Sequence, residues 1–217
     1  ERPDALRIAA MLERADVRDR LIGASALDEL EKGAIIGTCS PRRSAQLKRL
    51  RPDLVMVLLR GNVGTRLRKV EEGVVRATLL AAAGLDRLGL GAGVAIPVEI
   101  LLPAPGQAAI GVECRSADDR ILGLIAAINH RDTFDCVAAE RAFTRALGGS
   151  CASPVAALGS IVEDAVQLRA QLFSADGGEI VEADGRFGRG DLGGPQALAR
   201  VMLKRAPPTV RILFETA

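Results

Sequence analysis

The chain has 217 residues, of which 48% are apolar and 26% are charged, so it is long enough to bury a sizeable core in one or two domains. No apolar run approaches the roughly 18 residues of a membrane-spanning segment, and the charged first residues lack the apolar stretch of a secretory signal. We therefore expect a cytoplasmic protein with no membrane partner.

The net charge is small, but the basic residues are clustered. Lysine and arginine number 29 against 27 acidic residues, and the basic clusters around residues 42–51 and 60–69 favour anions locally. Nucleic acid is one possible partner, yet the chain has no Trp or Tyr and five Phe, so aromatic platforms for stacked bases are scarce. A small polyanionic ligand is the better interpretation, and we expect no nucleic-acid partner.

The cysteine and histidine content argues against metal chemistry. The four cysteines show no Cys-x-x-Cys spacing, and His130 is the single histidine. We therefore expect no metal site and no histidine-based catalytic triad.

Apolar periodicity in the first 130 residues predicts alternating strands and helices. The predicted strands are 6–12, 34–38, 54–59, 78–83 and 108–114, and the predicted helices are 41–51, 62–72 and 118–129. Ser40 is placed to cap the helix 41–51, whose Leu47 and Leu50 face inward, and Gly73 to close the helix 62–72. The run 54–59 is apolar throughout, which is typical of a strand covered on both faces. The alternation predicts a parallel α/β architecture.

The pattern changes after His130. Helices are predicted at 133–147 and 196–205, with shorter alternating segments around 155–160, 166–173 and 179–187. This order predicts a small α+β domain of antiparallel strands with helices on one face, joined to the first part by a linker at 129–132.

Arginine-bearing turns follow two of the predicted strands. Free N–H groups and the positive end of the helix dipole meet where a strand ends and a helix begins, and guanidinium groups match carboxylates bidentately. The residues at these turns are Thr38, Ser40, Arg42 and Arg43 in the first and Arg60 and Arg66 in the second. The alternative is that these arginines are solvated surface charge. Their repetition at two strand ends favours an anion site.

Two further positions extend this site. Arg87 follows the strand 78–83 and would join the crevice beyond the strand ends, although a lone arginine at a helix end has the simpler role of a terminal cation. Gln107 lies in a small-residue segment where the chain returns between regions, which suits a hinge or a ligand contact. Pro103 and Pro105 leave a plain stiff loop as the alternative.

Cys151 follows two glycines and a serine and precedes Pro154, which places its thiol on an adaptable loop. We interpret it as a tethering thiol, with a small buried hydrophobe as the alternative. Cys114 and Cys136, inside predicted elements, fit the buried role better, and Cys39 in the arginine turn remains ambiguous. No spaced pair of carboxylates indicates acid–base chemistry.

Six separated motifs occur together in the chain. They are Ile-Gly-Thr-Cys-Ser-Pro-Arg-Arg-Ser-Ala-Gln-Leu at 36–47, Leu-Arg-Gly-Asn-Val-Gly-Thr-Arg-Leu at 59–67, Ala-Ala-Gly-Leu-Asp-Arg-Leu-Gly at 82–89, Pro-Gly-Gln at 105–107, Ala-Glu-Arg-Ala-Phe at 139–143 and Gly-Ser-Cys at 149–151. In this order and spacing the chain resembles the porphobilinogen deaminase family, also called hydroxymethylbilane synthase, over essentially its whole length.

The resemblance implies a transferase of tetrapyrrole biosynthesis that condenses four porphobilinogen units head to tail to hydroxymethylbilane and releases ammonia. A dipyrromethane cofactor, attached through Cys151, would carry the growing chain. By motif, the cofactor-binding residues would be Cys151, Thr38, Ser40, Arg42, Arg43, Arg60 and Gly61, and the substrate-binding residues Arg66, Arg87 and Gln107. The implied protein is a monomer.

The family fold implies a periplasmic-binding-protein-like two-lobed α/β core, here with an incomplete first lobe, plus the small C-terminal α+β domain. The corresponding divisions are 1–15 with 105–130 for domain 1, 16–104 for domain 2 and 131–217 for domain 3, which bears the cysteine loop. The family's catalytic aspartate, in a His-Ser-x-Lys-Asp run, is expected upstream of Glu1, so no catalytic residue is assigned within this chain.

Some positions depart from the family pattern. Cys39 and Pro41 replace a more usual Ser and Leu, Gly148 stands where an acidic residue is common, and Arg76 replaces a customary Asp. Two alternatives remain beside the active transferase: an inactive fragment or carboxylate-binding module with the same cleft, and a nucleic-acid binder whose affinity falls steeply with salt.

Overall fold

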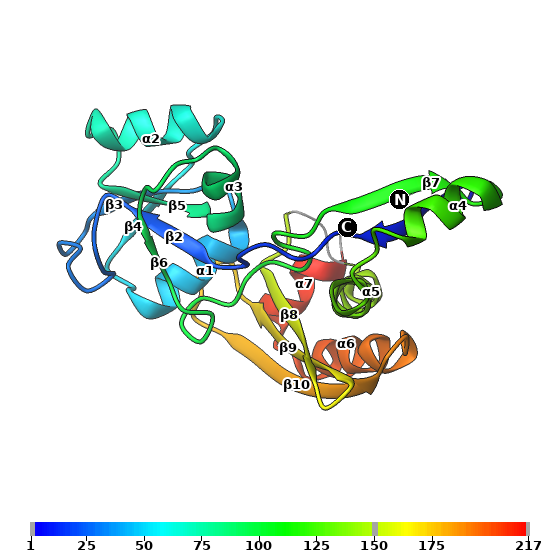
Figure 1. Ribbon diagram of the computed structural model, residues 1–217. Helices are drawn as coiled ribbons and strands as arrows, with labels where there is room; N and C mark the ends of the chain where they lie inside the picture. The colour runs from blue at the N-terminus through cyan, green and yellow to red at the C-terminus, as the bar shows by residue number, and fades with distance from the viewer. Residues whose placement is uncertain (1–2, 149–151, 216–217) are drawn as a thin grey trace.

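The computed structural model describes residues 3–148 and 152–215, whose strands form three separate sheets (Figure 1). The strand orders are β4-β3-β5-β2-β6, β1-β7 and β10-β9-β8. The expectation of a mixed α/β protein is therefore confirmed. None of the helices in the described ranges combines the length and the apolar character that crossing a membrane takes.

The five-stranded sheet lies in the middle part of the chain and is mixed rather than wholly parallel. Its strands are β2 (Asp19–Ile22), β3 (Ile35–Gly37), β4 (Val55–Val57), β5 (Ala77–Ala81) and β6 (Val94–Ala95). β3 runs parallel to β4 and β5, as predicted, whereas β2 is antiparallel to both β5 and β6. Sequence analysis did not identify β2 or β6. The predicted parallel architecture is therefore wrong where β2 pairs with β5 and β6.

Two predictions about burial in this sheet are wrong. β4 is an edge strand rather than a strand covered on both faces, because it pairs with β3 alone and leaves Val55 48% exposed. Leu58, directly after β4 and within the predicted strand, is 66% exposed. Leu50 does not face inward with Leu47; it is 43% exposed, whereas Leu47 is fully buried. An apolar run indicates that its residues tend to be buried. Whether they are buried depends on the elements that pack beside them, and at this edge of the sheet no strand covers them.

Three helices follow the strands of this sheet: α1 (Pro41–Leu50) after β3, α2 (Val63–Glu71) after β4 and α3 (Ala82–Arg87) after β5. Ser40 caps α1 as predicted, since its Oγ accepts from the Arg43 N–H at 3.4 Å. Gly73, with a φ of +71°, follows α2 in the left-handed conformation that ends helices. The far side of α1 contacts β8 and β9, so α1 lies between the first sheet and the third.

The two-stranded sheet pairs distant parts of the chain. β1 (Leu6–Met11) runs antiparallel to β7 (Gly111–Arg115), and α4 (Asp119–Ala126) packs beside them. The segment 129–132, predicted as a linker, is tied to β1: the Met11 N–H donates to Asn129 Oδ1 at 2.9 Å, and the His130 N–H donates to the Met11 carbonyl at 2.8 Å. His130 caps the following helix through its ring nitrogen.

The C-terminal part has the predicted antiparallel sheet. Its elements are α5 (Arg131–Leu147), β8 (Val155–Val162), β9 (Ala165–Phe173), β10 (Ile180–Gly188), α6 (Gly193–Arg205) and α7 (Pro208–Glu215). Helices α5 and α6 pack together against the sheet and bury Phe143, Leu168 and Met202 in one core. Sequence analysis missed α7, which contributes Phe214 to this core.

A buried carboxylate joins the three parts. Glu140 of α5 is fully buried and accepts from Arg14 Nη1 at 2.6 Å and Arg14 Nη2 at 3.1 Å. It also accepts from the Gly106 N–H at 2.6 Å and the Gly159 N–H at 2.7 Å. Arg14 precedes β2, Gly106 lies in the return segment before β7, and Gly159 is in β8, so one side chain fixes the meeting point of the three sheets.

Candidate functional site

The two arginine-bearing turns predicted from the sequence lie at the same sheet edge. β3 and β4 are parallel neighbours, so the turns that follow them leave the sheet side by side. The Thr38 N–H donates to the Val57 carbonyl at 2.9 Å, and Arg66 Nη2 lies 3.3 Å from Cys39 Sγ. The structure thus brings the first and second turns together.

The hydroxyl groups of the first turn shape the backbone. Thr38 Oγ1 accepts from the Ser40 N–H at 3.1 Å, and Ser40 Oγ caps α1. A hollow of about 300 Å³ opens at this turn. Its lining residues are Thr38, Cys39, Ser40, Pro41, Ser44, Lys48, Met56, Val57 and Leu58.

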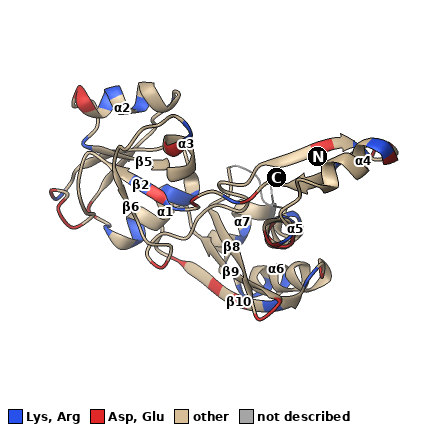
Figure 2. Cartoon of the chain, viewed as in Figure 1, with Lys and Arg blue, Asp and Glu red and all other residues tan. Residues whose placement is uncertain are grey.

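Arg42 and Arg43 meet a carboxylate from within the protein. Arg42 donates from Nη1 to the Leu102 carbonyl at 2.9 Å and from Nη2 to Asp19 Oδ2 at 2.8 Å. Arg43 donates to Asp19 Oδ1 from Nε at 3.2 Å and from Nη2 at 2.6 Å, and to the Leu79 carbonyl from Nη1 at 3.0 Å. The basic start of α1 lies beside the acidic residue of β2 (Figure 2).

Asp19 is the functional-site residue that sequence analysis missed. It is fully buried at the start of β2. Burial raises the pKa of its carboxyl, but the charges of Arg42 and Arg43 and their hydrogen bonds outweigh burial and lower the pKa below 3.8. Asp19 is therefore ionised at neutral pH and balances one of the two guanidinium charges.

Gln107 links this cluster to the return segment. Its Nε2 donates to the Val17 carbonyl at 2.6 Å and to Asp19 Oδ1 at 3.1 Å, while its Oε1 accepts from Arg42 Nη2 at 3.2 Å. The predicted small-residue hinge is therefore bound by side-chain hydrogen bonds to Arg42 and Asp19.

The Nε of Arg42 is a buried donor with no hydrogen-bond partner among the described residues. Its side chain is 4% exposed. Buried N–H groups are almost always paired in proteins, so this one lacks an acceptor that the described residues do not supply.

The second turn positions Arg66 through its backbone. Gly61 has a φ of +124°, a conformation that favours glycine, and its carbonyl accepts from Arg66 Nε at 2.9 Å. Asn62 Oδ1 accepts from the Thr65 N–H at 2.9 Å and caps α2. Arg60 is exposed, and within the described ranges no hydrogen bond or ion pair holds its guanidinium.

Arg87 is placed apart from the two turns. It is exposed in the last turn of α3, and in the described parts of the chain no hydrogen bond joins it to the other predicted site residues. Its neighbour Asp86 accepts from Arg20 Nη2 of β2 at 2.6 Å. The structure therefore places Arg87 beside the same five-stranded sheet, without a hydrogen bond to Arg42 or Arg43 in the described residues.

The proposed anchoring thiol, Cys151, lies outside the described residues. The helix that leads to it ends at Gly148, whose φ of +72° is the left-handed C-cap that favours glycine over an acidic residue. Of the other cysteines, Cys39 is exposed and Cys136 is buried. Burial is the main cause that raises the pKa of Cys136 to about 11, and the charge of Glu140 adds to it.

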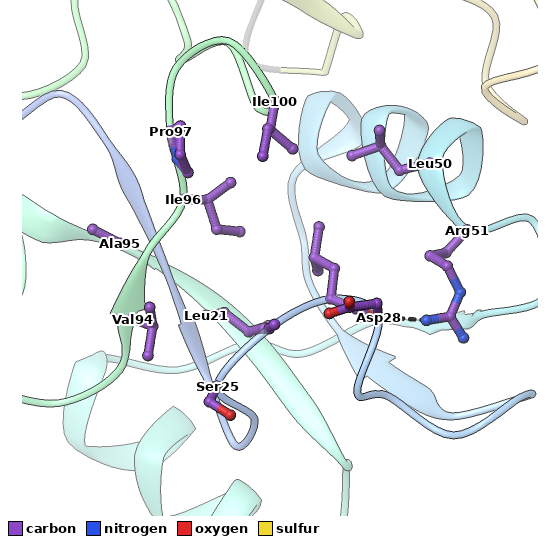
Figure 3. A pocket seen from close by; sticks show the side chains of 12 residues that line it. Leu21, Ser25, Asp28, Leu50, Arg51, Val94, Ala95, Ile96, Pro97 and Ile100 are labelled. Carbon is purple, nitrogen blue, oxygen red and sulfur yellow. Dashed lines mark hydrogen bonds between the residues drawn. The ribbon is translucent and has the colours of Figure 1, made fainter.

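The described residues contain no group of three or more His, Cys, Asp or Glu side chains arranged to hold a metal ion. A second hollow, of about 500 Å³, lies elsewhere on the five-stranded sheet. Leu21, Ile96 and Ile100 turn toward one another in it (Figure 3). Arg51 also lines this hollow, but its guanidinium donates to Asp53 and to the carbonyls of Leu27 and Leu30. Because its lining is largely apolar and this guanidinium is already bound, the hollow does not suit a carboxylate-rich ligand.

Comparison with known proteins identifies one family over most of the chain. The family model described as "Porphobilinogen deaminase, dipyromethane cofactor binding domain" matches residues 1–123, and "Porphobilinogen deaminase, C-terminal domain" matches residues 134–200. A curated relative named porphobilinogen deaminase, from Sphingopyxis alaskensis, is 52% identical over 216 residues, which cover 96% of this chain and 68% of the relative.

Proposed function

The chain belongs to the porphobilinogen deaminase family, and we propose that its arginine site holds the carboxylates of a dipyrromethane cofactor and of porphobilinogen. It is a transferase of tetrapyrrole biosynthesis, in which four porphobilinogen units are condensed stepwise, head to tail, to hydroxymethylbilane with release of ammonia. The cofactor, attached through Cys151, supplies the pyrrole on which the new units are built.

The observation that carries the site proposal is the meeting of the two arginine-bearing turns at one sheet edge. Each pyrrole unit bears two carboxylates, and guanidinium groups recognise carboxylates with paired hydrogen bonds. Thr38, Ser40, Arg42, Arg43, Arg60 and Gly61 are assigned to the cofactor, together with Cys151, and Arg66, Arg87 and Gln107 to the substrate. We assign no catalytic residue among the described residues.

The contacts within the protein leave donors for such a ligand. A guanidinium has five N–H donors. The contacts of Arg66 to the Gly61 carbonyl and to Cys39 Sγ engage its Nε and one Nη, which leaves further N–H groups for a carboxylate.

The division into domains is part of the same proposal. Residues 1–15 with 105–130 form domain 1, residues 16–104 domain 2 and residues 131–217 domain 3, with the first two arranged as periplasmic-binding-protein-like lobes. The three separate sheets support this division. We also propose a cytoplasmic monomer, which size-exclusion chromatography and cell fractionation would test.

A porphobilinogen experiment tests the proposed function. The chain is incubated with porphobilinogen, added mass on Cys151 is measured by mass spectrometry and ammonia is assayed. We expect added mass on the unaltered chain with one ammonia released for each attached unit, no added mass with Cys151→Ser and a reduced yield with Arg66→Gln. Continued release of ammonia beyond the attached units would contradict the placement of the catalytic aspartate upstream of Glu1. Arg205→Gln, at an exposed arginine of α6, is the matched control and should equal the unaltered chain.

The outcomes separate the alternatives. Binding of porphobilinogen with neither added mass nor ammonia would favour the carboxylate-binding module that does not turn over. Equal yields from Arg66→Gln and Arg205→Gln would contradict the assignment of the arginine site.

A further inference from the structure

Asp19 stands at the centre of the polar cluster behind the arginine site. It is fully buried, and both of its oxygens accept hydrogen bonds from guanidinium groups: Oδ2 from Arg42 at 2.8 Å and Oδ1 from Arg43 at 2.6 Å and 3.2 Å. Gln107 Nε2 donates to the same Oδ1 at 3.1 Å. Every polar atom of this carboxylate therefore contacts a residue of the proposed site.

The cluster holds two positive charges against one negative charge. Among the described residues, the guanidinium of Arg43 donates one other hydrogen bond, to the Leu79 carbonyl at 3.0 Å, so Asp19 supplies most of what fixes it. Arg42 keeps contacts to Leu102 and Gln107 without Asp19. Removing the Asp19 carboxylate thus frees Arg43 more than it frees Arg42.

We propose that Asp19 is a positioning residue: it fixes the guanidinium of Arg43 and leaves the arginine pair one net positive charge, which matches one carboxylate of a pyrrole ligand. This inference rests on the proposed function of the arginine site. Asp19 acts through Arg43, because its buried carboxylate is itself saturated by protein donors.

The geometry separates this role from that of an ordinary structural ion pair. Arg51 and Asp53 also form an ion pair, with a distance of 2.8 Å. Arg51 additionally donates to the Leu27 and Leu30 carbonyls and lines the apolar hollow, so this pair lies away from the two arginine-bearing turns. The side chain of Arg43 is 11% exposed and keeps N–H donors beyond those that Asp19 and Leu79 accept. Asp53→Asn is therefore the matched control for Asp19→Asn.

The experiment is a double-mutant cycle on the full chain. The dissociation constant for porphobilinogen is measured by calorimetry for the unaltered chain, Asp19→Asn, Arg43→Gln, the double variant and Asp53→Asn. We expect Asp19→Asn and Arg43→Gln each to weaken binding by roughly 10- to 100-fold, as misplacement of a binding group does. The double variant should bind about as weakly as Arg43→Gln alone, because Arg42 and Gln107 keep their contacts to the Leu102 and Val17 carbonyls without Asp19, whereas Arg43 depends on it.

A charge-conserving swap keeps the test valid if Asp19→Asn folds poorly. In Asp19→Asn/Gln107→Glu the carboxylate moves to position 107, whose Oε1 already lies 3.2 Å from Arg42 Nη2. The net charge of the cluster is unchanged, but the hydrogen bond from position 107 to the Val17 carbonyl is lost, so we expect the urea midpoint to recover in part. Because Gln107 is itself assigned to the substrate, the comparison is with Gln107→Glu alone, and the swap variant should bind porphobilinogen more weakly than that single variant, since its carboxylate no longer reaches Arg43 from the side of β2.

The results distinguish this inference from the proposed function. Weak binding by Arg43→Gln with unaltered binding by Asp19→Asn, equal affinity of the swap variant and Gln107→Glu, or additive effects in the double variant would each overturn the positioning role and leave the proposed function standing. Wild-type affinity of Arg43→Gln would instead remove that arginine from the proposed site.

Discussion

Arg14 and Glu140 form a bidentate ion pair at the point where the three sheets meet. The two Nη–Oε distances are 2.6 Å and 3.1 Å, and the glutamate side chain has no exposed surface. The same carboxylate accepts from the backbone of the return segment and of β8. The relative placement of the arginine site and of the helix that leads to Cys151 therefore depends on one buried charge.

We predict that Glu140→Gln destabilises the protein by about 3–5 kcal/mol, because it leaves a nearly buried guanidinium without its counter-charge. The measurement is urea unfolding at neutral pH. The matched control is Glu163→Gln. Glu163 forms an ion pair with Arg186, and the two side chains are 77% and 52% exposed. That pair should be worth no more than about 1 kcal/mol. Equal effects of the two substitutions would show that Glu140 does not bind the sheets together.

Gly61 and Gly64 are predicted to respond in opposite ways to alanine. At Gly61 the φ is +124° and an added Cβ would lie 2.8 Å from Thr65 Cγ2, whereas at Gly64 the nearest atom would be 3.7 Å away. Gly61→Ala should cost about 1–3 kcal/mol and weaken porphobilinogen binding through displacement of Arg66. Gly64→Ala should stabilise α2 by up to about 1 kcal/mol. Thermal unfolding of both variants checks this, and equal shifts in Tm would refute it.

The local parts of the fold were predictable because local chemistry determines them. Ser40 is followed by Pro41 and a helical pattern, and the structure has the expected cap at that position. The antiparallel C-terminal sheet likewise follows from alternating apolar residues in β9, where Val166, Leu168 and Ala170 are buried. In both cases neighbours in the sequence suffice to specify the structure.

The long-range parts were not predictable in this way. β2 and β6 are short strands whose pairing with β5 and with each other depends on residues far away in the chain. Because β2 was missed, Asp19 at its first position was missed with it: the sequence Asp-Arg-Leu-Ile does not show that the aspartate is buried against two distant arginines. The exposed faces of Leu50 and Val55 also depend on which neighbours reach the sheet edge.

The Arg51–Asp53 pair predicts a specific loss of stability in acid. The hydrogen bond from Arg51 is the main cause that lowers the pKa of Asp53 from 3.8 to about 2. A carboxyl with a lower pKa in the folded state adds stability above its unfolded pKa and loses it as the pH falls through the folded value. The difference in unfolding free energy between the wild type and Asp53→Asn should therefore be constant above about pH 5 and vanish toward pH 2. If the difference in unfolding free energy between the two proteins stays unchanged at pH 2, the ion pair is not the source of the lowered pKa.

Cys39 and Cys136 are predicted to react with iodoacetamide at very different rates. Cys39 is exposed at the first arginine turn, whereas Cys136 is buried in α5 with a pKa raised to about 11, so its reactive thiolate is scarce at neutral pH. In the native protein, Cys136 should react at least about 1000-fold more slowly than Cys39, because access requires unfolding. Timed labelling followed by peptide mass spectrometry measures both rates. In the control the protein is unfolded in about 8 M urea, where the difference between the two rates should largely disappear. Comparable native rates would mean that α5 opens far more readily than its packing against β8 and α6 indicates.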